Sequence, residues 1–193
     1  LISIITDEGV TGNSFFGSAM GSAERDAPFI VKALKPLLIG EDPFARERIW
    51  QSMIKRAKGG GLSAVGAVDV ALWDLAGKAV GLPVHKLIGS HRSSVPAYAS
   101  SAVLDSPGEY AEEATRYREM GWQAYKIHPH GEPDFDVEIC EAVRKAVGDD
   151  YRIMLDSTWS YDYPGALQVG KVAEALGFYW YEDPLADDDL YGY

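Results

Sequence analysis

Residues 152–182, RIMLDSTWSYDYPGALQVGKVAEALGFYWYE, decide the fold. The short apolar run at 152–156 is typical of a buried strand, and 164–176 carries apolar residues at helical spacing up to Gly177. A second apolar run at 178–182 predicts another strand. A strand, a helix and a strand joined by short turns form a unit whose two strands pair in parallel.

The same alternation extends upstream of this unit. We predict strands at 95–100 and 122–128, and helices at 107–120 and 135–147. Four strands alternating with helices, at intervals of roughly 25–30 residues, indicate a parallel sheet or a (β/α) barrel. A closed barrel needs about eight strands, so we expect the chain to be a portion of a larger protein. An open doubly wound sheet is the alternative.

The region before residue 94 has a different pattern. Residues 1–12 predict a strand and the turn of a hairpin, and 13–26, rich in small residues, predicts a loop. Helical patterns begin at Pro28, cover 43–57 and cover 62–79. This mixture is typical of a separate α+β unit.

Composition excludes several classes of protein. The 193 residues include 18 basic and 29 acidic side chains, a net charge of −11, which disfavours nonspecific binding to nucleic acid or anionic membranes. No stretch approaches the roughly 20 apolar residues of a membrane span. The single cysteine, Cys140, excludes an intramolecular disulfide and a multi-cysteine metal site. The first residues show no signal-peptide pattern, and we expect a cytoplasmic protein.

Polar residues end three of the predicted strands. Lys126 and His128 share one face of the strand at 122–128, because side chains alternate along a strand. Asp156 ends the next strand, and Glu182 ends the one after it. The carboxyl ends of parallel strands build the active site in parallel α/β folds. We therefore expect these four residues to lie in one site.

These residue types fit one kind of chemistry. Two carboxylates, Asp156 and Glu182, are suitable ligands for Mg²⁺, which prefers oxygen. A lysine beside a cation has its ammonium form disfavoured, so Lys126 can act as a base, and His128 is a second candidate. A metal also stabilises the negative charge that develops when a proton leaves a carbon next to a carboxylate. The set predicts proton abstraction α to a carboxylate.

Plainer interpretations exist for the same region. A lone acidic residue at a strand end is more often a loop cap or an ion-pair partner. Asp183 is an alternative ligand to Glu182, although it begins a turn at Pro184 instead of continuing the strand. The aromatic residues at 178–181 are most simply core residues, and His130 is most simply a loop residue.

Several stretches resemble the enolase superfamily, specifically its mandelate racemase/muconate lactonizing enzyme branch. TDEGVTG at 6–12 resembles a hairpin of that branch's capping domain. AVDVALWDLAGK at 67–78 and GLPVHKLIG at 81–89 resemble its last cap helix and the start of its barrel. LD at 155–156 and YEDP at 181–184 are similar to its first two metal-ligand strands. The resemblance covers nearly the whole chain.

The resemblance implies a fold class and two domains. It implies an α/β protein with an α+β capping domain at 1–93, incomplete at its start. The first four strands of a (β/α) TIM-type barrel would follow at 94–193. A third metal ligand and an acid/base group on the opposite face of the barrel are expected beyond Tyr193.

The resemblance also implies roles for the site residues. Asp156 and Glu182 would hold Mg²⁺, and an enediolate would form, as in other enolase-superfamily enzymes with a Lys or His base. The branch commonly carries Lys-x-Lys where this chain has Lys126 and His128, so which of the two is the base stays open. An Asn often stands where this chain has Thr158, which we expect to contact substrate.

The function that fits best is a Mg²⁺-dependent lyase, an acid-sugar (hydroxy-acid) dehydratase. The alternatives are a racemase, epimerase or cycloisomerase of the same branch, a noncatalytic binding protein on the same scaffold, and another metal barrel such as an aldolase. Phe15 and Phe16, in the predicted loop at 13–26, are expected to cover the cavity and bind substrate. We also expect a homo-oligomer that acts on a small-molecule carboxylate, with no nucleic-acid or membrane partner.

Overall fold

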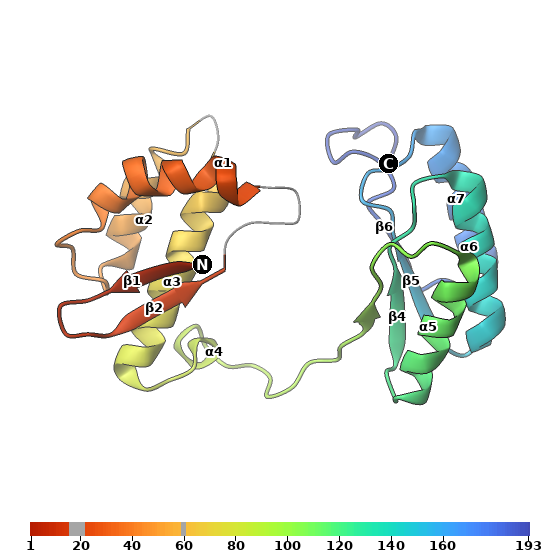
Figure 1. Ribbon diagram of the computed structural model, residues 1–193, viewed down its shortest axis with the longest axis horizontal. Helices are drawn as coiled ribbons and strands as arrows, with labels where there is room; N and C mark the ends of the chain where they lie inside the picture. Colours follow the sequence, from red (N-terminus) through yellow and green to blue (C-terminus); the bar gives the residue numbers. More distant parts are fainter. Residues whose placement is uncertain (16–21, 59–60) are drawn as a thin grey trace. The chain divides into compact units, whose positions relative to one another are not determined.

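The computed structural model describes residues 1–15, 22–58 and 61–193. The chain divides into two compact units, Leu1–Ser93 and Ser94–Tyr193. Figure 1 shows the helices and strands of each unit. Among the described residues, no helix combines the length and the apolarity needed to cross a membrane.

The first unit contains a β-hairpin and a group of helices. Strands β1 (Ile2–Ile5) and β2 (Thr11–Ser14) pair in antiparallel fashion. The helical segments are α1 (Ser22–Phe29), a π-helical turn (Ile30–Leu34), a 3₁₀ turn (Lys35–Leu37), α2 (Arg46–Ile54), α3 (Leu62–Val80) and α4 (Val84–Leu87).

The structure contradicts the loop predicted at 13–26 at both of its ends. Ser14 still pairs with Ile2, and its hydroxyl donates to the Ala67 carbonyl, so β2 continues to Ser14. At the other end of the predicted loop, α1 already begins at Ser22. The prediction was wrong at both ends because small residues do not by themselves prevent strand pairing or helix formation.

Helix α3 forms the centre of the first unit. Its residues Val65, Val68 and Leu72 are buried in one apolar cluster with residues of the other helices and of β1. Gly12 in β2 lies so close to α3 that a Cβ would fall 2.1 Å from the Ala71 carbonyl oxygen. This packing therefore requires glycine at position 12.

The second unit alternates strands and helices along the chain. Its elements are β3 (Ala99–Ser100), α5 (Pro107–Glu119), β4 (Ala124–Ile127), α6 (Pro133–Val147), β5 (Arg152–Asp156), α7 (Tyr163–Ala175) and β6 (Trp180–Glu182). The strands are parallel and lie in chain order, β3-β4-β5-β6. Helices α5, α6 and α7 all lie on one face of this sheet (Figure 1).

The strand order distinguishes between the two predicted architectures. A doubly wound sheet reverses its strand order and places helices on both faces, whereas a (β/α) barrel adds each strand beside the last and keeps its helices outside. The observed order and the single helical layer are those of the first four strands of a barrel. The predicted fold class is thereby confirmed.

Side-chain alternation gives the sheet two different faces. Tyr125, Ile127 and Leu155 are buried in the apolar core beneath the helices. Lys126 lies between Tyr125 and Ile127, and Asp156 directly follows Leu155. Lys126 and Asp156 therefore point to the opposite face, which corresponds to the inside of a barrel. The sequence thus places its polar residues on the face that the helices do not cover.

A buried arginine in α6 bonds to the two loops that lead from helices into the N-terminal ends of β5 and β6. Arg144 in α6 is 6% exposed. Its guanidinium donates to the main-chain carbonyls of Leu176, Gly148, Tyr151 and Gly177, at 2.8, 2.7, 2.8 and 3.2 Å. These carbonyls follow the ends of α6 and α7, where helices leave carbonyl groups without helical partners.

Candidate functional site

The four predicted site residues lie at the ends of three neighbouring strands. Asp156 and Glu182 stand opposite each other in register on β5 and β6. The Lys126 ammonium on β4 lies 2.7 Å from Asp156 Oδ2 and 3.2 Å from Glu182 Oε2. Lys126 and Asp156 are only 8% and 6% exposed. Two carboxylates from different strands therefore converge on one positive charge.

The charges in this cluster stabilise one another. Burial raises the pKa of Asp156, but hydrogen bonding and charge from Lys126 outweigh it, so that the pKa lies below its ordinary value. Burial lowers the pKa of Lys126, but hydrogen bonds and charges from Asp156 and Glu182 outweigh it and raise the pKa. In the arrangement seen here, Lys126 is an ammonium and Asp156 is a carboxylate.

His128 follows β4 and is oriented by the end of β3. Its main-chain N–H donates to the Ser101 hydroxyl at 2.9 Å, and its Nδ1 lies 2.8 Å from the Ser101 carbonyl. A carbonyl can only accept, so Nδ1 carries a proton. The other ring nitrogen, Nε2, lies 3.1 Å from Asp156 Oδ2. Nε2 is therefore the nitrogen that faces the site.

The loops after β5 and β6 have an unusual backbone. Thr158, Trp159 and Asp183 have φ angles of +48°, +64° and +47°, and they are the three non-glycine residues with positive φ in the described parts of the chain. Main-chain hydrogen bonds from Ser157 to Glu182 and from Trp159 to Asp183 continue the pairing beyond the sheet. Left-handed backbone at such residues is disfavoured and gathers at functional sites.

The predicted substrate-contacting residues belong to different units of the chain. Thr158 donates its main-chain N–H to Asp156 Oδ1 at 3.2 Å, so its backbone belongs to the site. Phe15 is 91% exposed and lies in the first unit. Phe16 lies outside the described residues. Asp183, the alternative ligand, is exposed in the left-handed turn, and Glu182 is the carboxylate that meets Lys126.

Sequence reasoning missed one participant. The aromatic residues at 178–181 were interpreted as core, and Phe178 and Tyr181 do pack against the core cluster. Trp180 is not among the residues that pack against this cluster, and its indole N–H donates to Glu182 Oε2 at 3.1 Å. The signal that could have found it is the alternation that places positions 180 and 182 on the same face.

The donor set fits a hard cation in part. Asp156 and Glu182 direct oxygen atoms at one positive centre, the ammonium of Lys126, and oxygen is what Mg²⁺ prefers. Within residues 1–15, 22–58 and 61–193, no group of three or more His, Cys, Asp or Glu side chains is arranged to hold a metal ion. These residues would thus supply two oxygen ligands, and Mg²⁺ usually keeps several waters or substrate oxygens in addition.

Comparison with known families covers most of the chain. The family described as "Mandelate racemase / muconate lactonizing enzyme, N-terminal domain" matches residues 1–89, and "Enolase C-terminal domain-like" matches residues 109–193. Together with the half-barrel and its strand-end carboxylates, these matches define an enolase-superfamily protein. The chain belongs to the mandelate racemase/muconate lactonizing enzyme branch of that superfamily.

One curated relative and two solved structures illustrate the similarity. The chain is 32% identical to a D-galactarolactone cycloisomerase of Agrobacterium fabrum, over 100% of this chain and 53% of the relative. It resembles the solved structure of a D-glucarate dehydratase from Agrobacterium tumefaciens complexed with magnesium. The TM-score is 0.85 and the identity 35%, over 98% of this chain and 53% of the dehydratase. The solved structure of a racemase from Streptomyces coelicolor A3(2) with bound magnesium is similar with a TM-score of 0.89 and 30% identity, over 98% of this chain and 59% of the racemase. The chain thus spans about half the length of the relatives it matches.

Proposed function

We propose that this protein is a Mg²⁺-dependent enzyme that removes the proton next to a substrate carboxylate, and that loss of a β-hydroxyl follows, as in an acid-sugar dehydratase. The observation that carries the proposal is the convergence of Lys126, His128, Asp156 and Glu182 at the ends of β4, β5 and β6. The similarity to a D-glucarate dehydratase supports the reaction class.

Asp156 and Glu182 are the residues that would hold Mg²⁺. The similarity of the chain to two solved structures that contain magnesium supports this assignment. Bound Mg²⁺ would supply electrostatic stabilisation of the negative charge that develops on the substrate when the proton leaves. Strand pairing holds the main chains of both residues opposite each other before any ligand arrives.

His128 is the residue we propose as the base. The Ser101 carbonyl fixes the proton of His128 on Nδ1, so Nε2 faces the site, within reach of a proton to be removed. The Lys126 ammonium provides a positive charge beside it that can attract a substrate carboxylate. The two residues thus divide proton transfer and substrate orientation between them.

Two substitutions separate the metal role from the proton role. Glu182→Gln removes a charged oxygen ligand, so calorimetry should show weaker Mg²⁺ binding, and turnover should fall. His128→Asn keeps both carboxylates, so Mg²⁺ should bind as in the wild type. Exchange of the substrate α-proton with deuterated water should then collapse. If His128→Asn exchanges normally and Lys126→Met does not, Lys126 is the base.

The product distinguishes the related activities. A racemase or cycloisomerase would begin with the same proton abstraction, and the similarity to a cycloisomerase and to a racemase favours keeping these as the second candidate. Incubation of the protein with acid sugars should yield a 2-keto-3-deoxy acid if it is a dehydratase, and an isomer of unchanged composition otherwise. Pyruvate or an aldehyde would indicate an aldolase. A complete lack of proton exchange with every acid sugar would favour a noncatalytic binding protein.

Several expectations stay proposals about the whole protein. We propose that residues 1–93 form the capping domain and that Phe15 and Phe16 contribute to substrate binding from it. Replacing both phenylalanines by alanine should change KM or substrate preference more than the melting temperature. The small-molecule carboxylate substrate, the cytoplasmic location and the homo-oligomeric state also stay predictions.

A further inference from the structure

Glu182 is less constrained by burial than its partner carboxylate. The Glu182 side chain is 39% exposed, whereas that of Asp156 is 9% exposed. Asp156 Oδ1 also accepts from the Thr158 main chain, and Asp156 Oδ2 lies 3.1 Å from His128 Nε2. A half-exposed glutamate has several accessible rotamers, so something other than packing has to keep its oxygen directed toward Asp156 and Lys126.

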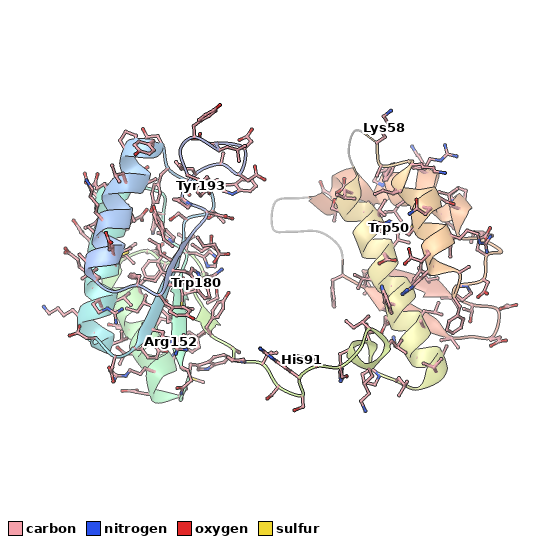
Figure 2. The ribbon with its side chains drawn as sticks, turned by 180° about the vertical axis from the view of Figure 1, so that it is seen from behind. Trp50, Lys58, His91, Arg152, Trp180 and Tyr193 are labelled. Carbon is pink, nitrogen blue, oxygen red and sulfur yellow. The ribbon has the colours of Figure 1, made fainter. Side chains whose placement is uncertain are left out.

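Trp180 supplies that constraint from the same strand. It stands two residues before Glu182 on β6, and its Nε1–H donates to Glu182 Oε2 at 3.1 Å. Trp180 is labelled in Figure 2, and the alternation of side chains along β6 places it on the same face of the sheet as Glu182. An indole N–H is a donor only, and it does not titrate. It therefore favours the same carboxylate position whatever the charge of its neighbours.

The indole is itself held in place. The ring of Tyr98, just before β3, meets the Trp180 ring edge-to-face with centroids 5.5 Å apart. The same Tyr98 ring lies 5.7 Å from the Lys126 ammonium. The Tyr179 ring also contacts the Trp180 ring, with centroids 5.4 Å apart. A donor buttressed in this way loses little further freedom when it bonds to a carboxylate, so the hydrogen bond orients Glu182 instead of following it.

We propose that Trp180 is a positioning residue, which fixes the Glu182 carboxylate in the orientation needed to bind a divalent cation together with Asp156. This inference rests on the proposed function for the role of the cation, but the contact itself does not depend on it. Groups that hydrogen-bond to metal ligands typically affect metal affinity by about 10–100-fold. Because Lys126 also bonds to Glu182, we expect the lower end of that range.

The decisive variant removes the N–H and keeps the ring. Trp180→3-benzothienylalanine replaces the indole nitrogen by sulfur with nearly the same shape, and Trp180→Phe is the coarser companion. Trp122→3-benzothienylalanine is the matched control, because Trp122 packs on Tyr117 through a comparable edge-to-face contact. Each variant of the whole protein is measured for Mg²⁺ affinity by calorimetry and for its melting temperature without metal.

The expected result is a Mg²⁺ dissociation constant about 10-fold larger in the Trp180→3-benzothienylalanine protein, with an unchanged melting temperature and a normal control. An affinity within twofold of the wild type would overturn the proposal. Equal losses in the Trp180 and Trp122 variants would overturn it as well, since they would indicate a general effect of the analogue.

A second readout works without metal. The ¹⁵N–¹H indole resonance of Trp180, assigned through Trp180→Phe, should move upfield in Glu182→Ala, while the Trp122 resonance stays in place. If the wild type binds no Mg²⁺ but this shift occurs, the proposed metal role fails and the positioning contact stands. If the Trp180 resonance does not move, the contact is absent and the proposal is overturned.

Discussion

Lys126 occupies the position between the two carboxylates that a divalent cation would be expected to share. The substitution Lys126→Met keeps most of the side-chain volume and removes the charge. Two unit charges 4 Å apart contribute about 4 kcal/mol at an effective dielectric constant of 20, and removal of one partner from a buried pair costs about 3–5 kcal/mol. The pair with Asp156 is buried, but the pair with Glu182 is partly exposed and screened. We therefore expect the free energy of unfolding of the metal-free protein to fall by about 3 kcal/mol.

The same substitution should have the opposite effect on cation binding. Without the ammonium, the carboxylates of Asp156 and Glu182 lose the charge that competes for their oxygens, so added Mg²⁺ should raise the stability of Lys126→Met more than that of the wild type. Urea unfolding with and without Mg²⁺ measures both effects. Lys171→Met, at an exposed position of α7, is the matched control. Unchanged stability of the metal-free variant, or an equal Mg²⁺ response, would refute the reasoning that Lys126 and the cation use the same oxygens.

Three further outcomes are expected away from the site. Arg144→Met, which leaves several carbonyl groups unbonded, should lower the free energy of unfolding by about 3 kcal/mol in urea titrations, and a loss below about 1 kcal/mol would contradict the role of Arg144. Burial raises the pKa of the Cys140 thiol in α6 to about 12. A disulfide reagent at pH 8 should therefore label Cys140 only after the protein has unfolded. Rapid labelling of the native protein would contradict this expectation and show that α6 packs loosely. Hydrogen bonds from Lys78 and from the Asn13 main chain lower the pKa of Asp74. Its stabilising contribution should therefore be present above the ordinary carboxyl pKa near 4 and disappear as the pH falls through the lower folded pKa. The stability difference between wild type and Asp74→Asn, within about 1 kcal/mol for this exposed pair, should accordingly vanish in acid, and a difference that grows in acid would reverse the sign of the argument.

The sequence predicted the elements whose period was long and regular. The strand at 152–156 has the predicted bounds, and α3 and α6 agree with their predicted ranges within two residues. The strand predicted at 95–100 is limited to Ala99–Ser100, because only these two residues pair with β4. A sequence pattern can identify a segment that is suited to a strand. How many of its residues become a strand depends on how many of them pair with the neighbouring strand.

Alternation along the strands also brought the candidate site together, because positions 126 and 128, then 156, then 182 were all predicted at the ends of adjacent parallel strands. Trp180 escaped prediction for a physical reason. Its position satisfies the same alternation, but an aromatic residue beside Phe178 and Tyr181 fits a core as well as a site. Only the orientation of its indole N–H toward Glu182 distinguishes the two. That orientation depends on Tyr98, which is distant in sequence.

The residues with left-handed backbone beside the site were also not predicted from the sequence. Thr158 is β-branched and does not favour a positive φ, whereas Asp183 is of a type that tolerates one better than most. Each such conformation costs on the order of 1 kcal/mol or more. The cross-loop hydrogen bond from Trp159 to Asp183 and the bond from the Thr158 N–H to Asp156 offset part of that cost. The second bond also uses an oxygen of a proposed metal ligand. The strained backbone and the orientation of the carboxylate are therefore linked in one local structure, which no single residue of the sequence specifies alone.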